Sequence, residues 1–136
     1  MCLDEYRVKP IGFVRSALKD REAAPRQGDE RAPPASIDLE PSVSDALQGI
    51  AVGDELVVVT WLHEARRDVL QVHPRDDESQ PLTGVFATRS PDRPNPLGLH
   101  RVTVLGIAGN ELRVGPLEAI DGTPVVDLKP VLREDR

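Results

Sequence analysis

The C-terminal part of the chain alternates apolar segments with sharp turn signals, and this pattern constrains the fold more than any other feature. Apolar residues are frequent in 97–107, 111–120 and 124–128, and the pairs at 109–110 and 121–122 separate these segments. The pairs are Gly-Asn and Asp-Gly, which accept the positive φ that tight hairpin turns require. We therefore expect three consecutive antiparallel strands here.

Further segments with strand character precede this part. Residues 8–15 alternate in the manner of a strand, and 36–39 can form a short one. The β-branched run at 55–63 suits a strand buried on both faces, and we expect it to be the central strand. Shorter strands are expected at 68–73 and 84–90.

One helix and one long loop complete the predicted elements. Residues 41–49 predict about two helical turns, in which Ser42 accepts a hydrogen bond from the backbone N–H of Asp45 and Gly49 ends the helix. Residues 16–34 are polar, contain three prolines and lack apolar periodicity, so they predict a long loop. Loops of this length in compact domains are usually functional or disordered.

These elements predict a mainly all-β protein. The chain has 136 residues, the size of one domain, and no repeat, low-complexity tract or linker divides it. We expect residues 1–136 to form a single compact β-barrel with one short helix and a long N-terminal loop.

Composition excludes several classes of protein. The hydrophobic fraction is 39% and no apolar run approaches the roughly 20 residues of a membrane span. The first residues have neither a basic nor an apolar segment of an export signal, so a cytoplasmic location is expected. Cys2 is the single cysteine, which rules out an internal disulfide or a multi-thiolate zinc site within one chain.

The charge is negative overall but uneven along the chain. A formal net charge of -6 argues against nucleic-acid binding through a general basic surface. Residues 7–31, however, contain seven Lys or Arg and four Asp or Glu, a local excess of three positive charges. A restricted basic face therefore remains possible.

Residues 86–98 form the most unusual segment, because three prolines and a glycine restrain the backbone around two arginines. Proline limits the unfolded chain as well as the folded one, so little ordering is needed when a ligand binds. Arg89 and Arg93 could then hold a carboxylate or phosphate. The alternative is a turn in which the arginines pair with Asp92 or other surface acids.

Other candidate residues have an ordinary explanation beside a functional one. His63 and Glu64 end the predicted central strand and could provide a base or a ligand contact, or His63 could be a partly buried histidine bonded to a carbonyl. Asp121 belongs first to a turn, and Lys129 could be a surface charge or a pocket cation. Arg26 and Gln27 could bind a purine edge or a sugar hydroxyl, or could lie in a solvated loop.

The chain also lacks several motifs. The three histidines, His63, His73 and His100, have no close spacing, so no metal site is expected. There is no glycine-rich dinucleotide fingerprint, P-loop or nucleophile elbow. A Rossmann-type methyltransferase, a hydrolase and a nucleotide kinase are therefore disfavoured.

Five motifs, taken together, closely resemble the TsaA-like domain of the TrmO family. They occur in the family's order and span nearly the whole chain. They are IGFVRS at 11–16, PRQ at 25–27, GVFATRSP at 84–91, RPNPLGL at 93–99 and DGTPVVDLKP at 121–130.

The resemblance implies a β-barrel methyltransferase that uses S-adenosylmethionine and forms a homodimer with the cofactor near the subunit interface. It also implies tRNA as the partner, with methylation at N6 of a threonylcarbamoylated adenosine beside the anticodon. Two alternatives stay open: a methyltransferase for another RNA or a small molecule, and a non-catalytic module that binds the cofactor.

The resemblance also assigns roles to particular residues. Asp121 and Lys129, with Arg93, are the candidates for the methyl-transfer site or the tRNA surface. Where the family usually has tyrosine after Lys-Pro, this chain has Val131, which removes an aromatic hydroxyl. The implied cofactor contacts are Pro25, Arg26, Gln27, His63, Glu64, Arg89, Leu99, Gly115, Pro116, Leu117 and Glu118.

Overall fold

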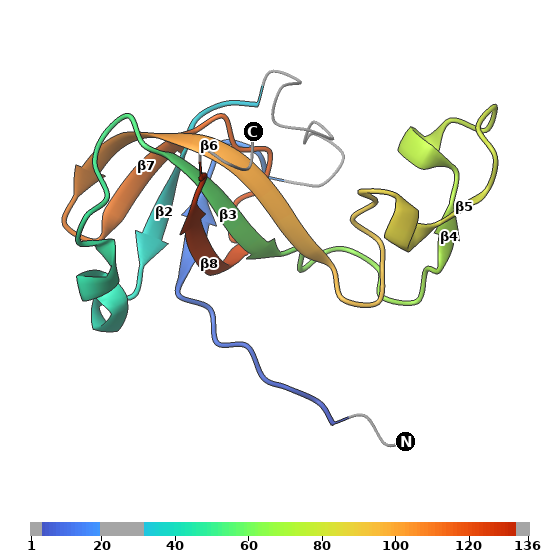
Figure 1. The fold of residues 1–136 in the computed structure, drawn as a ribbon, viewed down its shortest axis with the longest axis horizontal. Helices are drawn as coiled ribbons and strands as arrows, with labels where there is room; N and C mark the ends of the chain where they lie inside the picture. Colours follow the sequence, from blue (N-terminus) through green and yellow to red (C-terminus); the bar gives the residue numbers. More distant parts are fainter. Residues whose placement is uncertain (1–3, 20–31, 133–136) are drawn as a thin grey trace.

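The molecule is built around a closed β-barrel, which confirms the predicted fold class (Figure 1). The computed structural model describes residues 4–19 and 32–132. The strands follow one another around the barrel in the order β1-β2-β7-β6-β3-β8, and every neighbouring pair is antiparallel. Their bounds are β1 (Gly12–Arg15), β2 (Ala35–Leu39), β3 (Glu55–Trp61), β6 (Leu97–Ala108), β7 (Glu111–Gly115) and β8 (Pro124–Pro130).

Alternation of inward and outward side chains explains how the strands form a barrel. In β3, Leu56 and Val58 are buried inside, whereas the intervening Val57 and Val59 are half-buried on the outer face. The expectation that β3 is buried on both faces was therefore wrong. A small barrel packs side chains only in its interior, so a β-branched run can line one wall without a second layer outside it.

The core consists of inward-facing aliphatic side chains from all six barrel strands. Two further core residues, Leu117 and Ala119, come from the connection between β7 and β8. This connection is not strand, although the expected strand extended to residue 120. Pro116 follows Gly115 at the end of β7 and cannot donate a ladder hydrogen bond, which accounts for the shorter strand.

The expected turns are present, but the expectation of three consecutively paired strands was wrong for the last pair, since β8 pairs with β1 and β3 and not with β7. The expected helix is modified. Gly109 and Gly122 have φ values of 59° and 85°, in the left-handed region that these turns require. The segment η1 (Pro41–Leu47) is a 3-10 helix, and its cap residue, Glu40, makes no side-chain capping bond. The predicted Ser42 cap was wrong because Pro41 begins the helix one residue earlier.

A lobe formed by residues 62–96 projects from the barrel between β3 and β6 (Figure 1). It contains the short strands β4 (Gln71–Val72) and β5 (Thr83–Gly84) and the 3-10 turns η2 (Pro74–Asp76) and η3 (Val85–Ala87). The strand expected at 84–90 is largely replaced by η3. The Val85 carbonyl accepts hydrogen bonds from both the backbone N–H and the hydroxyl of Thr88, which closes this turn.

The first strand is shorter than expected, and only part of the expected long loop is described. The first strand begins at Gly12, since Pro10 cannot donate to a neighbouring strand. The preceding residues leave the barrel as an extended segment (Figure 1). Of the expected loop at 16–34, residues 16–19 and 32–34 contain no strand, and 20–31 lie outside the described residues. Among the described helices, none is both long and apolar enough to span a membrane.

Candidate functional site

The end of β3, the start of β6 and the start of β8 meet at one end of the barrel. Thr60 of β3 is paired with Gly98 of β6 and with Val125 of β8. His63 and Glu64 follow β3 after one intervening residue, and the connection that contains Glu118 leads into β8. The register therefore gathers several of the predicted site residues at this end, which we call the β3 end.

A chain of hydrogen bonds crosses the interior of the β3 end. Thr60 Oγ1 lies 2.7 Å from His100 Nε2, and His100 Nδ1 lies 2.6 Å from Glu118 Oε1. Thr60 is 0% exposed and His100 is 5% exposed, whereas the Glu118 side chain is 15% exposed. Only the carboxylate end of this Thr60–His100–Glu118 chain reaches the surface.

The hydroxyl–imidazole–carboxylate order is the order found in serine hydrolases, but the burial is different. A nucleophilic hydroxyl must be open to substrate. Thr60 is fully buried, so its hydroxyl is not accessible for attack on a substrate. The chain instead satisfies the polar atoms of a buried histidine and connects them to Glu118.

Thr60 and His100 were not predicted to belong to the site. Both lie at inward-facing positions, because Thr60 continues the series Leu56, Val58 and His100 precedes the buried Val102. A polar residue at a core position of a strand is a signal for a buried hydrogen bond. Pairing the two required the strand register, which the sequence pattern does not supply.

Arg93 is occupied by the backbone of the lobe. Its Nε donates to the Ser90 carbonyl at 2.9 Å, and its Nη2 donates to the carbonyls of Thr88, at 2.5 Å, and Val85. These contacts fasten the segment from η3 to residue 90. Arg93 therefore shapes the loop and is not available as the second half of an anion clamp.

Arg89 lies on the loop that Arg93 fastens, and its side chain is exposed. Within the described part of the chain, no hydrogen bond or ion pair holds its guanidinium. The alternative of a turn in which the arginines pair with Asp92 or other surface acids does not describe this loop, because Arg93 donates to backbone carbonyls and, among the described residues, no acid holds Arg89. Arg89 is thus presented to the solvent on a restrained backbone.

Two neighbouring arginines link the two ends of the lobe, and one of them also contacts the barrel. Arg67 Nε donates to the Pro94 carbonyl at 2.8 Å, and its guanidinium carbon lies 5.2 Å from the centre of the Trp61 ring. The Arg93 backbone N–H donates to the Arg66 carbonyl at 3.0 Å. The proline-rich segment is consequently held close to the end of β3.

Asp121 lies at the β3 end and links the turn before β8 to the segment that follows β1. Its Oδ1 accepts the Ser16 backbone N–H at 2.9 Å, and its Oδ2 lies 3.2 Å from Lys19 Nζ. Both contacts stabilise the carboxylate and lower the pKa of Asp121, the Ser16 hydrogen bond most strongly. A polar cavity of about 560 Å³ lies beside it, lined also by Arg15 and Arg113.

Lys129 is not brought near Asp121. It pairs with Val57, whereas Val125 on the same strand pairs with Thr60. Four residues of strand correspond to roughly 13 Å. The Lys129 side chain is exposed and its Nζ lies 3.1 Å from Asp127 Oδ2.

The remaining predicted contacts are spread over different surroundings. Leu99 is 51% exposed on the outer face of β6, opposite to the inward His100. Leu117 is 0% exposed in the core, so its side chain is not available to a ligand. His63 Nε2 lies 3.9 Å from Glu64 Oε2, and Pro116 is exposed. Pro25, Arg26 and Gln27 lie outside the described residues.

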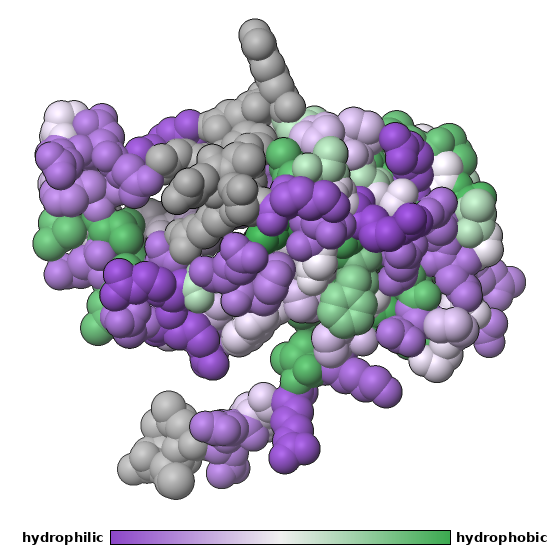
Figure 2. All heavy atoms as spheres, turned by 180° about the vertical axis from the view of Figure 1, so that it is seen from behind, coloured by the Kyte–Doolittle hydropathy of each residue, from purple (hydrophilic) through white to green (hydrophobic). Residues whose placement is uncertain are grey.

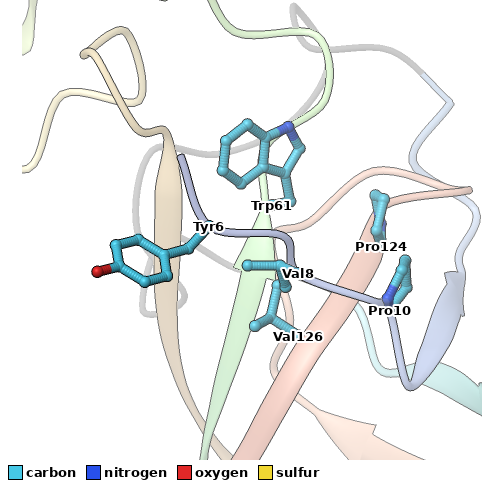
Figure 3. Close-up of a pocket in the computed structure, with 6 residues that line it drawn as sticks. All are labelled: Tyr6, Val8, Pro10, Trp61, Pro124 and Val126. Atoms are coloured by element: carbon cyan, nitrogen blue, oxygen red, sulfur yellow. The ribbon is translucent and has the colours of Figure 1, made fainter. Parts of the chain in front are cut away.

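An apolar recess of about 250 Å³ opens on the outer face of β3 and β8. Figure 3 shows Trp61 at its rim, with the N-terminal segment crossing over the two strands. The segment contributes Tyr6, Val8 and Pro10, and β8 contributes Pro124 and Val126. No role was predicted for these residues from the sequence.

The surface mixes polar and apolar side chains, as Figure 2 shows from behind. The projecting lobe carries an apolar patch among polar residues, and Phe86, Leu70 and Leu82 of the lobe are 84%, 66% and 54% exposed. Among the described residues, no group of three or more His, Cys, Asp or Glu side chains is placed to hold a metal ion.

Comparison with known proteins relates this chain to S-adenosylmethionine-binding proteins. A probable S-adenosyl-L-methionine-binding protein of Methanothermobacter thermautotrophicus is 44% identical over 126 residues, which cover 93% of this chain and 90% of the relative. An S-adenosyl-L-methionine-binding protein of Archaeoglobus fulgidus is 41% identical over 122 residues, with 90% and 86% covered.

Solved structures agree with this relationship. TrmO from Pseudomonas aeruginosa superposes with a TM-score of 0.77 at 29% sequence identity, over 96% of this chain. The match covers 58% of the TrmO chain, so this protein corresponds to little more than half of it. The model of the tRNA-methyltransferase O N-terminal domain matches residues 13–135, and the chain therefore belongs to that domain family.

Proposed function

We propose that this protein binds S-adenosylmethionine and is a methyltransferase for tRNA. The observation that carries the proposal is the exposed Arg89 guanidinium, which has no partner in the described residues and lies on a loop fastened by Arg93. An arginine held in this way can bind the carboxylate of the cofactor with little loss of conformational entropy.

Glu118 and the acids of the β3 end suit the other part of the cofactor. S-adenosylmethionine carries a positive sulfonium and an ammonium group, which nearby carboxylates stabilise. Glu118 reaches the surface at this end, and Glu64 is also exposed there. The relatives named as S-adenosyl-L-methionine-binding proteins support the same ligand.

Methyl transfer places few demands on the protein. The sulfonium is already a reactive methyl donor, so the protein must chiefly align the acceptor nitrogen with the methyl group. A strong general base is not required. A buried Thr60 and an Asp121 that is bonded to Ser16 and Lys19 are therefore compatible with the reaction. Asp121 and Lys129 remain proposed contributors to the site.

The acceptor that we propose is N6 of the threonylcarbamoylated adenosine beside the tRNA anticodon, because the matched family is a tRNA-methyltransferase domain. A cytoplasmic location follows from this partner. We further propose a homodimer with the cofactor near its interface, in which the outward Leu97 and Leu99 of β6, 45% and 51% exposed, become covered.

Calorimetric titration with S-adenosylmethionine tests the cofactor. We expect saturable binding that Arg89→Ala abolishes or weakens by more than tenfold, since a charged hydrogen-bond pair contributes about 1.5–3 kcal/mol. Arg101→Ala is the matched control, because Arg101 is an exposed arginine paired with Glu55 away from the β3 end. Absence of binding by the unsubstituted protein at millimolar cofactor would contradict the proposal.

Transfer of a labelled methyl group to bulk tRNA tests the reaction. The proposal predicts label in RNA that ribonuclease treatment releases. Label in another fraction would favour a different RNA or a small molecule as acceptor. Cofactor binding without release of S-adenosylhomocysteine under any of these conditions would favour a non-catalytic binding module.

A further inference from the structure

We infer that His100, fixed by Thr60, positions the Glu118 carboxylate for the cofactor. This inference rests on the proposed function, because it concerns how one contact of the cofactor site is held. Neither Thr60 nor His100 touches the cofactor, since both are buried. They act through Glu118, whose side chain is the exposed end of the Thr60–His100–Glu118 chain.

The donor and acceptor capacities of the three groups assign the direction of the hydrogen bonds. An ionised Glu118 can only accept, so His100 Nδ1 must carry the proton over the 2.6 Å contact with Oε1. In the neutral ring, Nε2 is then an acceptor, and the Thr60 hydroxyl donates to it over 2.7 Å. This assignment uses both ring nitrogens and leaves the second oxygen of Glu118 for another donor.

The hydrogen-bond chain connects a loop residue to two paired strands of the barrel. Thr60 and His100 belong to β3 and β6, which are paired along seven consecutive residues of β3. Glu118 lies in the connection between β7 and β8, outside any strand. Buried hydrogen bonds that lock the rotamer of a binding residue improve its alignment with a ligand. His100 thus gives Glu118 a fixed orientation that its own backbone segment does not provide.

The packing around the Thr60–His100–Glu118 hydrogen bonds favours one arrangement of these side chains. Leu117 and Ala119, on either side of Glu118, are buried in the core. A Cβ on Gly98 would lie 2.5 Å from Thr60 Oγ1 and 2.7 Å from His100 Nε2. Thr60 and His100 therefore pack closely against the backbone of Gly98, which restricts the imidazole on that side.

Two substitutions of His100 separate its bonds. In His100→Asn the amide nitrogen can take the place of Nδ1 and still donate to Glu118, whereas His100→Gln places its amide near the position of Nε2 and loses that donor. We expect His100→Gln to weaken S-adenosylmethionine binding about tenfold, as Glu118→Gln does, and His100→Asn to weaken it less than about threefold.

A double-variant cycle measured by calorimetry tests whether His100 acts through Glu118. If it does, His100→Gln adds no further loss in the Glu118→Gln background. Additive losses, or equal affinities of the unsubstituted protein and His100→Gln, would overturn the inference while leaving the proposed function intact. Failure of the unsubstituted protein to bind would overturn the proposed function and, with it, the cofactor role of this chain of bonds.

A spectroscopic measurement on the unsubstituted protein covers the case in which His100→Gln does not fold. The imidazole nitrogen chemical shifts of His100 should show a protonated Nδ1 and an unprotonated Nε2 at neutral pH, and Thr60→Val should change the Nε2 shift. A ring protonated only at Nε2 would overturn the inference, because Nδ1 could not then donate to Glu118.

Discussion

At the scale of single residues, Gly98 leaves the space that Thr60 and His100 occupy inside the β3 end. Gly98 belongs to the rigid segment that the sequence identified, but its importance was not predictable. Its neighbours Thr60 and His100 are 38 residues before it and two residues after it, and only the pairing of β3 with β6 brings them together. Thr60 and His100 are visible in the sequence as polar residues, but their contact follows only from the register of β3 with β6.

Replacement of Gly98 with alanine should destabilise the protein. The new methyl group would lie 2.5 Å from Thr60 Oγ1 and 2.7 Å from His100 Nε2, so the buried chain must shift. We expect a loss of about 1–3 kcal/mol in the free energy of unfolding, measured with urea. Gly84→Ala is the matched control, since nothing lies within 4 Å of its Cβ position and its φ is -59°. Equal losses in both variants would contradict this account.

Asp121 should contribute a pH-dependent stability. Its pKa is lowered by the Ser16 backbone hydrogen bond and by Lys19, so its contribution is complete above the unfolded pKa of about 3.9 and is lost as the pH falls through the folded pKa. Asp121→Asn should therefore be less stable than the unsubstituted protein near neutral pH. The two free energies of unfolding should converge in acid, and a constant difference at all pH values would disprove the prediction.

At the scale of elements, the restrained loop of the lobe illustrates what a sequence motif can and cannot indicate. Three prolines predicted a rigid segment, and Arg89 is exposed on it, while its role as a ligand contact stays a prediction. The resemblance also placed Arg93 among the candidates, but its guanidinium binds the carbonyls of Val85, Thr88 and Ser90. An arginine that organises its own loop and one that binds a ligand look alike in a sequence, because the difference depends on where the backbone carbonyls point.

Arg93→Lys should separate loop order from barrel stability. Lysine keeps the charge but lacks the planar group that binds several carbonyls at once. We expect affinity for S-adenosylmethionine to fall roughly tenfold through misplacement of Arg89, with little change in the thermal unfolding of the barrel. Combination with Arg89→Ala should cause no additional loss. Full affinity in Arg93→Lys would show that the loop does not need this arginine.

At the scale of the whole molecule, the barrel was predictable and its exterior was not. Alternation and turn signals indicated the strands because they reflect local geometry and burial. The recess between Trp61 and the N-terminal segment was not predicted, since it forms where Tyr6 and Val8 cross strands that are distant in the sequence. Such contacts depend on the path of the chain over the barrel, for which periodicity carries no information.

The N-terminal segment should shield Trp61 without supporting the barrel. Val8 lines the recess and is 53% exposed, so Val8→Asp should change the free energy of unfolding by no more than about 0.5 kcal/mol. The fluorescence of Trp61, the single tryptophan of the chain, should shift to longer wavelength as water enters. Val52→Asp, at a site 63% exposed outside the recess, should leave the emission unchanged. A large loss of stability in Val8→Asp would instead make the segment part of the core structure.

The closed order of the six strands also limits how a second molecule can attach to the barrel. Each barrel strand has a neighbour on both sides, so within the described residues none of the six is an edge strand of an open sheet, although β8 pairs with β1 only at Pro124 and Val125. Recognition at the barrel then relies mainly on side chains and loops. A closed strand order therefore leaves less backbone available for edge-to-edge association than an open sheet of six strands would.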